Sequence, residues 1–356
     1  MAKPIDLDIF GQEARRRHTP ESYAMSLADA RVIDIHAHAV LEKTLGGAGA
    51  FGPDLLSEPD GTPVFRIGDY RLRNVRYRGS AFMDLDVRLA RMTASGIDWQ
   101  LLSPNPLTYF HYIPAPEAIA FCRTHNDAMA AAVARCPDRL GGAAALPMQD
   151  IGAAVAELRR AVSDLGMLAA YIGSDMPHGL DDPRMDALYE TVTDLNVPLF
   201  IHPAPAGIDG PAGSPALKRY ELDIMAGFTA QETVAVATLV FGGVLARHPG
   251  LDICISHGGG AVALIWGRLE HAARRRPWAG DHLKGEHAFA EQMRRLWYDI
   301  HMHDARAVDL LAERVGTGRL VYGTNFSGWD APERFEPPTC DAPLADNARR
   351  LLHVTN

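Results

Sequence analysis

Two histidines separated by one residue stand at the end of an apolar run, in Asp34-Ile-His36-Ala-His38. Side chains alternate between the two faces of a β-strand, so residues two positions apart point the same way. Two imidazoles on one buried face, where aliphatic side chains are usual, make a pair of nitrogen ligands for a borderline divalent ion such as zinc. The pair therefore predicts a metal site at the end of this run.

Further histidines close other apolar runs. His202 follows Phe200-Ile, and His257 ends Cys254-Ile-Ser just before three glycines. A single histidine would be weak evidence, but three strand ends directed at one axis favour a metal centre over simple packing. A rival His-x-His pair, His301 and His303, follows a short and polar run, which is better suited to hydrogen bonding around ligands than to ligation itself.

The elements that must position these residues can be predicted from the hydrophobic pattern. Between short apolar runs lie amphipathic stretches with apolar residues at spacings of three and four, typical of helices. The stretches predicted as helices are 84–94, 116–134, 151–165, 183–194 and 229–246, and the runs predicted as strands are 32–38, 98–103, 140–145, 168–172, 198–202, 252–257, 296–300 and 320–323. Eight alternating strand and helix units predict a (β/α)₈ TIM barrel.

A bare barrel needs about 250 residues, and this chain has 356. We expect residues 1–30 to form an N-terminal arm and residues 31–356 to form the barrel. The segment 41–81 is rich in Gly, Pro and Arg and is too long for an ordinary connection, so it is either a lid or disordered. The lid is favoured because the segment leaves the carboxyl end of the first strand, and 205–213 forms a second loop at the same rim.

Composition restricts the class of protein. The chain is 47% hydrophobic and carries a formal net charge of −9. This charge excludes the basic surface that a nucleic-acid-binding protein uses to contact phosphates. We found no apolar stretch near the roughly 20 residues of a membrane span and no signal peptide, so we expect a soluble cytoplasmic protein. The four cysteines are widely spaced and form no ligand motif. Histidines and carboxylates must therefore supply any metal ligands.

These motifs together carry a family resemblance. The pattern comprises Ile33-Asp-Ile-His-Ala-His38, Ile201-His-Pro203, Ser256-His-Gly-Gly-Gly260 and Tyr322-Gly-Thr-Asn-Phe326. It resembles the amidohydrolase superfamily (the amidohydrolase 2 branch), on the side of the decarboxylases typified by 2-amino-3-carboxymuconate 6-semialdehyde decarboxylase. The resemblance runs from about residue 31 to the C-terminus and is far more specific than one His-x-His pair.

The resemblance implies a divalent metal, zinc in the first place and manganese as an alternative, held by His36, His38 and His202 with a fourth ligand from strand 8. It also implies that His257 acts as a general base beside the metal, and that no redox cofactor is needed. The implied reaction is loss of CO₂ from an unsaturated or aromatic carboxylic acid.

The family also anchors substrate carboxylates with arginines. Arg73 matches the arginine of the insertion after strand 1, and Arg268 and Arg276 match arginines that reach the site from a neighbouring subunit. Guanidinium suits this task because it binds a carboxylate through two parallel hydrogen bonds. A homodimer that binds a small carboxylate substrate is implied by the resemblance alone.

The chain departs from the family at strand 8, where Asn325 stands in place of the expected aspartate. An amide oxygen is a neutral, weaker ligand and cannot act as a base. An engineered substitution, a natural branch with different chemistry and a protein that only binds its ligand are the alternatives. The residues after Asn325 also depart from the family pattern, which favours a natural branch, and Asp330 belongs to the following loop.

Three functions therefore compete. The first is a metal-dependent, non-oxidative decarboxylase with His257 and Asn325 in its catalytic site. The second is a hydratase or hydrolase on the same scaffold, since the same metal chemistry adds water to a carbonyl or an alkene. The third is a ligand-binding protein without catalysis, suggested by Asn325 alone.

Overall fold

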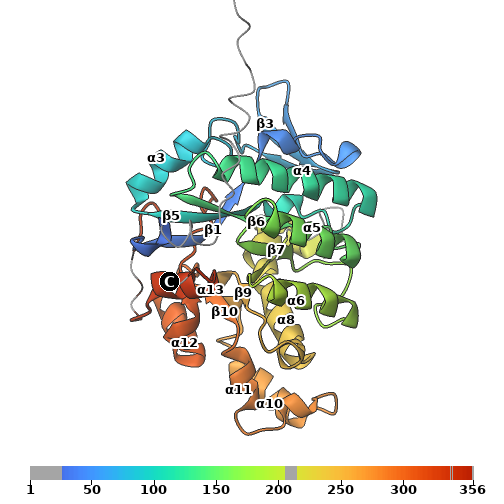
Figure 1. Ribbon diagram of the computed structural model, residues 1–356, viewed down its shortest axis with the longest axis vertical. Helices are drawn as coiled ribbons and strands as arrows, with labels where there is room; N and C mark the ends of the chain where they lie inside the picture. The colour runs from blue at the N-terminus through green and yellow to red at the C-terminus, as the bar shows by residue number, and fades with distance from the viewer. Residues whose placement is uncertain (1–25, 205–214, 337, 339, 355–356) are drawn as a thin grey trace, which may run out of the picture.

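The computed structural model of the chain describes residues 26–204, 215–336, 338 and 340–354. Eight parallel strands lie at its centre with helices around them (Figure 1). In sheet order the strands are β1 (Ile33–Ala39), β5 (Trp99–Pro104), β6 (Leu140–Ala145), β7 (Ala169–Gly173), β8 (Leu199–His202), β9 (Ile253–Ile255), β10 (Trp297–Asp299) and β11 (Leu320–Val321). All eight predicted strands are confirmed, with ends shifted by no more than two residues.

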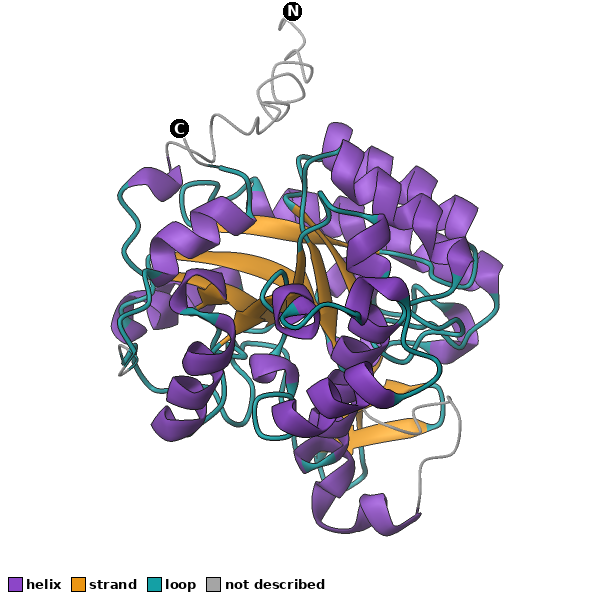
Figure 2. Cartoon of the chain, turned by 90° about the horizontal axis from the view of Figure 1, so that it is seen from below, coloured by secondary structure: helices purple, strands orange, loops and turns teal. Residues whose placement is uncertain are grey.

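Backbone hydrogen bonds between the first and last strands close the barrel. The Ile35 amide donates to the Tyr322 carbonyl at 3.0 Å, and the Phe326 amide donates to the His36 carbonyl at 3.1 Å. The predicted TIM barrel is therefore confirmed, and the closing bonds lie at the residues next to the His-x-His pair. A view at right angles shows the strands enclosed by helices (Figure 2).

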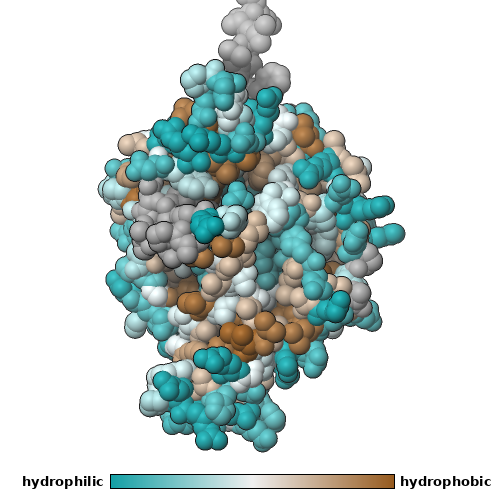
Figure 3. All heavy atoms as spheres, turned by 180° about the vertical axis from the view of Figure 1, so that it is seen from behind, coloured by the Kyte–Doolittle hydropathy of each residue, from teal (hydrophilic) through white to brown (hydrophobic). Residues whose placement is uncertain are grey.

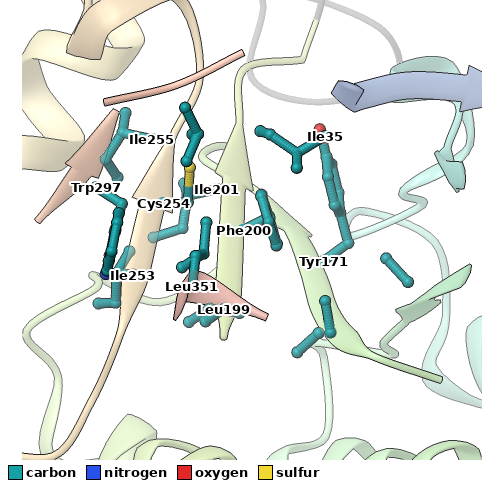
Figure 4. Packing of buried hydrophobic residues seen from close by; sticks show 14 of the residues in the cluster. Ile35, Tyr171, Leu199, Phe200, Ile201, Ile253, Cys254, Ile255, Trp297 and Leu351 are labelled. Atoms are coloured by element: carbon teal, nitrogen blue, oxygen red, sulfur yellow. The ribbon is translucent and has the colours of Figure 1, made fainter. Parts of the chain in front are cut away.

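The strands are buried on both faces, as expected for a parallel sheet covered by helices. Tyr171, Phe200, Ile253 and Trp297 are among the side chains that fill the core beneath the histidines (Figure 4). The Gly-Gly-Ala sequence of β6 is small because Trp99 occupies the adjoining space, where a Cβ on Gly141 would lie 2.5 Å from the Trp99 ring.

The predicted helices form with small differences at their ends. The helices are α3 (Leu85–Ser95), α4 (Ala115–Val133), α5 (Ile151–Ser163), α6 (Asp186–Asp194), α7 (Leu222–Met225), α8 (Gly227–Phe241), α9 (Val244–Arg247), α10 (Trp266–Arg275), α11 (Ala288–Met293), α12 (Ala305–Val315) and α13 (Leu344–Leu351). Asp84 and Asp150 cap α3 and α5 by accepting hydrogen bonds from backbone amides of the first turn. The predicted single helix over 229–246 is wrong, because Gly243 adopts a left-handed φ of 71° and divides it into α8 and α9.

The insertion after β1 is an ordered sheet, so the alternative of disorder is wrong. Its strands β2 (Asp54–Ser57), β3 (Pro63–Ile67) and β4 (Tyr70–Arg73) pair antiparallel. Phe65 and Tyr77, with ring centres 4.6 Å apart, belong to a small core that also includes Phe121 of α4. The insertion is thus attached to the barrel through its own apolar contacts. The described part of the predicted N-terminal arm starts at residue 26, and the loop 205–213 lies outside the described residues.

One segment, Arg219–Phe241, is long and apolar enough to span a membrane by length and composition, so the expectation that no apolar stretch approaches this length is wrong. The chain is not one straight helix there, since Tyr220 and Glu221 have positive φ and α7 ends before α8 begins. The middle of α8 buries the carboxylate of Glu232 against β9, where it accepts a hydrogen bond from Ser256 at 2.6 Å. In this structure the segment therefore covers the barrel.

We expect Phe65→Ala to loosen the insertion, because truncating a fully buried phenylalanine costs about 3–5 kcal/mol. Limited proteolysis should then cut within 41–81 well before it cuts the barrel. Leu56→Ala on β2 is the matched control, since Leu56 is 43% exposed and its removal should cost little. Equal proteolysis of both variants would show that the insertion does not rely on this core.

Candidate metal centre

Three imidazoles converge at the carboxyl ends of β1 and β8. The Nε2 atoms of His36 and His38 are 3.1 Å apart, and those of His38 and His202 are 3.3 Å apart. All three side chains are almost completely buried. The two-residue period of β1 places His36 and His38 on one face, as the sequence predicts.

The other nitrogen of each ring is held by an acceptor. His36 Nδ1 donates to Asp299 Oδ2 at 2.9 Å, His38 Nδ1 to the Pro104 carbonyl at 2.9 Å, and His202 Nδ1 to the Pro203 carbonyl at 2.6 Å. A proton on each Nδ1 leaves three Nε2 lone pairs facing one another. Such lone pairs repel unless a cation lies between them, so the residues fit a divalent metal ion.

Burial keeps these rings neutral. It lowers the pKa of His36 to about 4, although the Asp299 carboxylate acts in the opposite direction. Burial and the neighbouring imidazoles place the pKa of both His38 and His202 well below the usual value. Metal ligation requires the neutral imidazole, so the site is in the required protonation state at neutral pH.

His257 lies beside the three histidines but in a different electrostatic setting. Its ring centre is 5.0 Å from that of His36 and 5.1 Å from that of His202. Its Nδ1 donates to Glu232 Oε1 at 2.6 Å. Burial lowers the pKa of His257, but the Glu232 carboxylate outweighs burial and raises it to about 9. The Glu232 carboxylate therefore favours the protonated form of His257, in contrast to the three neighbouring rings.

Donor atoms of His36, His202 and His257 also lie within 4.8 Å of one another, so a second triad of ligands is geometrically open. The Glu232 ion pair favours a proton on His257, whereas His38 is held neutral. His38 is thus the ring that joins His36 and His202 through close Nε2 atoms, whereas His257 is the ring held by a carboxylate. The backbone of His257 has a φ of 45°, a costly conformation that recurs at functional positions.

Asp299 and Glu232 are site residues that the sequence analysis missed. Asp299 is buried at the end of β10, where its Oδ1 accepts hydrogen bonds from the His257 amide at 2.9 Å and the His301 amide at 3.0 Å. Burial raises the pKa of Asp299, but His36 outweighs it and holds the pKa near 2. The acidic residue at a strand end was a signal for Asp299. Glu232 lies inside a helix and carried no comparable signal.

Asn325 follows β11, which ends earlier than predicted, and the side chain lines the cavities above the histidines. Its Nδ2 donates to Asp330 Oδ1 at 2.7 Å. Asp330 also contacts His301 and His303, so this loop residue belongs to the site although it does not join the three convergent imidazoles. Direct ligation by Asn325 stays a prediction.

Two adjacent cavities open above the metal centre. The larger, about 500 Å³, is lined by His38, His202, Arg73 and Asn325. The smaller, about 330 Å³, is lined by His257, His301, Asn325 and Asp330. The insertion supplies one wall of the larger cavity, which agrees with its predicted position over the site.

The three predicted arginines lie in different places. Arg73 lines the larger cavity and forms an ion pair with Glu58 at 2.8 Å. Arg268 on α10 and Arg276 just beyond it are exposed, and neither is among the described residues that line the two cavities. Their predicted role from a second subunit stays a prediction.

The chain resembles known proteins along most of its length. It is 30% identical over 244 residues to the 2-amino-3-carboxymuconate-6-semialdehyde decarboxylase of Dictyostelium discoideum, and the matched region covers 68% of this chain and 66% of that protein. It is 34% identical over 200 residues to the gamma-resorcylate decarboxylase of Rhodococcus jostii (strain RHA1), which covers 52% and 59%. The chain thus spans somewhat less than two thirds of the length of these relatives.

A similar structure is the dihydroxybenzoic acid decarboxylase of Polaromonas sp. JS666, solved with bound manganese and 2-nitroresorcinol. The two chains share 21% identity at a TM-score of 0.68, covering 91% of this chain and 97% of that one. This likeness confirms the fold.

A closed parallel barrel with a convergent histidine cluster at its strand ends defines the class of metal-dependent barrel proteins. The amidohydrolase family model matches residues 33–354, and the chain belongs to this family. The resemblance inferred from the histidine motifs is confirmed.

We predict that His36→Ala, His38→Ala and His202→Ala each weaken metal binding by at least about 100-fold, since even outer contacts of a metal site contribute 10–100-fold. The fold should persist because the barrel core lies beneath the rim. Elemental analysis and thermal unfolding measure the two effects, with the exposed His271→Ala as control. Full metal content in all three variants would contradict the site.

Proposed function

We propose that this protein is a metal-dependent, non-oxidative decarboxylase of an aromatic or unsaturated carboxylic acid, a carbon–carbon lyase. The observation that carries the proposal is the convergence of three buried imidazoles beside a fourth one, His257, which is hydrogen-bonded to Glu232 at the wall of an adjoining cavity. Decarboxylation of this type needs a cation near the substrate oxygens and a proton for the carbon that loses CO₂. The names of the two curated relatives support the same reaction.

When bound, the metal ion supplies a positive charge that polarises a substrate oxygen. In this mechanism His257 is a proton donor and not the general base that the resemblance implies. It donates its proton to the carbon that carries the carboxylate. The bond to the carboxylate breaks, its electron pair returns to the unsaturated system, and CO₂ leaves, so that a proton replaces the carboxyl group. Glu232 orients the His257 ring and keeps it charged before the transfer.

The cavity walls suit an aromatic or unsaturated acid. Ile224, Phe228 and Trp329 line both cavities and give the substrate an apolar surface. Arg73 is the charged residue of the predicted substrate set that already faces the larger cavity. Its ion pair with Glu58 holds the guanidinium on the wall, where it can receive a substrate carboxylate.

For the metal itself we propose zinc, with manganese as the alternative. Three imidazole ligands suit a borderline ion, and the order of affinities of such sites favours zinc over manganese. The manganese in the Polaromonas structure supports the alternative.

A homodimer and a cytoplasmic location are also proposals. Exposed apolar side chains, among them Val234, Leu264 and Trp278, support a surface that another subunit covers. Seen from behind, hydrophobic residues gather in a patch toward the lower end of the molecule (Figure 3). Sedimentation of the purified protein measures its oligomeric state.

Hydration or hydrolysis on the same scaffold is the competing reaction. Product analysis separates the two, because decarboxylation releases CO₂ whereas hydration adds the mass of one water. A screen of carboxylated catechol-pathway intermediates with the metal-loaded protein would test both. Binding without turnover of any such acid would favour the non-catalytic alternative.

We predict that His257→Ala lowers turnover about 100-fold or more while the metal is retained, as expected for a proton donor.

Glu232→Gln provides a finer test of the same role. The raised pKa keeps His257 protonated to higher pH, so activity falls as pH rises through that pKa. Removing the Glu232 charge lowers the pKa, and the falling limb of the pH profile should move to lower pH.

The pH–rate profiles of wild type and Glu232→Gln, together with the metal content of both, measure this effect. Loss of metal in His257→Ala would instead make His257 a ligand. An unmoved limb in Glu232→Gln would remove the proton-donor role.

Asn325→Asp should tighten metal binding, because a carboxylate is a better ligand than an amide for a divalent cation. If the asparagine belongs to a natural branch, the native reaction should slow, since the charge of the site is set for a neutral residue. If it replaced an aspartate, turnover should rise. Asn74→Asp, on the wall of the same cavity, is the matched control for an added charge. Unchanged metal affinity would show that residue 325 does not face the ion.

A further inference from the structure

A second cluster of metal-binding residue types lies beside the first. His301 Nε2 and His303 Nε2 lie 3.0 Å and 3.1 Å from the same atom, Asp330 Oδ2. Their donor atoms all lie within 4.8 Å of one another. His301 and Asp330 are largely buried, whereas His303 is 54% exposed and closes the cluster toward solvent.

The cluster is held in place from several sides. The His301 amide donates to Asp299 Oδ1 at 3.0 Å, and the Asn325 side chain donates to Asp330 Oδ1 at 2.7 Å. The second oxygen of Asp330 is therefore left facing the two imidazoles. The ring centres of His301 and His303 are 4.4 Å apart, with the ring planes at 71° to each other.

We propose that His301, His303 and Asp330 bind a second divalent transition-metal ion. Two imidazoles and one carboxylate are a known ligand set for such ions, with coordination positions left open for water or substrate. Ligands about 2.0–2.1 Å from a tetrahedral ion lie roughly 3.3 Å apart. The two imidazole–carboxylate separations, 3.0 Å and 3.1 Å, are close to this value, and all the donor atoms lie within 4.8 Å of one another.

The second site faces the smaller cavity together with His257 and Asn325. The ring of His301 is 5.8 Å from that of His36 and 5.7 Å from that of His257. Asp299 links the two clusters, because one of its oxygens contacts His36 and the other accepts from the His301 amide. An ion at this position would add a positive charge to the cavity and attract an oxyanion there.

The competing arrangement is a hydrogen-bonded trio in which Asp330 accepts protons from both imidazoles and no ion binds. It requires a proton on Nε2 of each ring. The two arrangements differ in metal stoichiometry, which does not depend on any substrate or turnover. The test therefore fails or succeeds independently of the proposed reaction.

The experiment begins with the full chain stripped of metal by a chelator and then loaded with Zn²⁺ or Mn²⁺ in separate titrations. After removal of free ions, elemental analysis should find two equivalents in the wild type. His303→Ala and Asp330→Asn should each retain one, and His202→Ala should retain the other. His271→Ala, a change at an exposed histidine of α10, should keep two.

One equivalent in the wild type that persists in both His303→Ala and Asp330→Asn would overturn the second site and establish the hydrogen-bonded trio. One equivalent that is lost in those variants but kept in His202→Ala would support the second site while contradicting the first. Thermal unfolding of each variant shows that its fold is intact, and since His303 is half exposed, His303→Ala should unfold close to the wild type.

Discussion

The metal centre depends on one buried carboxylate, that of Asp34. Its Oδ2 accepts hydrogen bonds from the Thr324 hydroxyl at 2.7 Å and from Gln100 Nε2 at 2.8 Å, and its Oδ1 accepts from the His36 amide at 3.1 Å. These bonds join β1 to β5 and to the segment after β11, at the seam where the barrel closes. Burial raises the pKa of Asp34 to about 6, although the hydrogen bonds act against it. A buried carboxylate is costly unless its oxygens accept hydrogen bonds. These donors therefore stabilise Asp34 inside the barrel, and Asp34 in turn supports the site.

Arg88 extends this network to the second histidine. The guanidinium is buried, donates to Gln100 Oε1 at 2.9 Å and donates to the His38 carbonyl at 2.5 Å. Its positive charge stabilises the buried Asp34 carboxylate, and its hydrogen bond fixes the backbone of His38. The positions of His36 and His38 therefore depend on these hydrogen bonds as well as on the period of β1.

The features that could be predicted from the sequence are those that depend on local residue patterns. Apolar runs gave the eight strands, and the His-x-His spacing gave two ligands, because alternation along a strand is a local property. Glu232 could not be found in this way, since a glutamate in a helix usually faces water and only the packing of α8 on β9 brings it to His257. The position of the insertion was predicted, but its sheet was not, because its Gly, Pro and Arg content masks the few apolar residues, such as Phe65 and Ile67, that hold the sheet.

The four histidines of the site are all largely buried, but the groups next to them differ, and so do the shifts of their pKa values. The imidazoles of His36, His38 and His202 are buried among one another, and burial lowers the pKa of each, even that of His36 beside the Asp299 carboxylate. His257, about 5 Å from His36, is also largely buried, but it meets Glu232 and becomes charged. Three imidazoles whose pKa burial lowers therefore lie next to one whose pKa a carboxylate raises. The single residue that divides these roles is a carboxylate placed by a neighbouring helix, so the function of the strand ends depends on how α8 packs against the barrel.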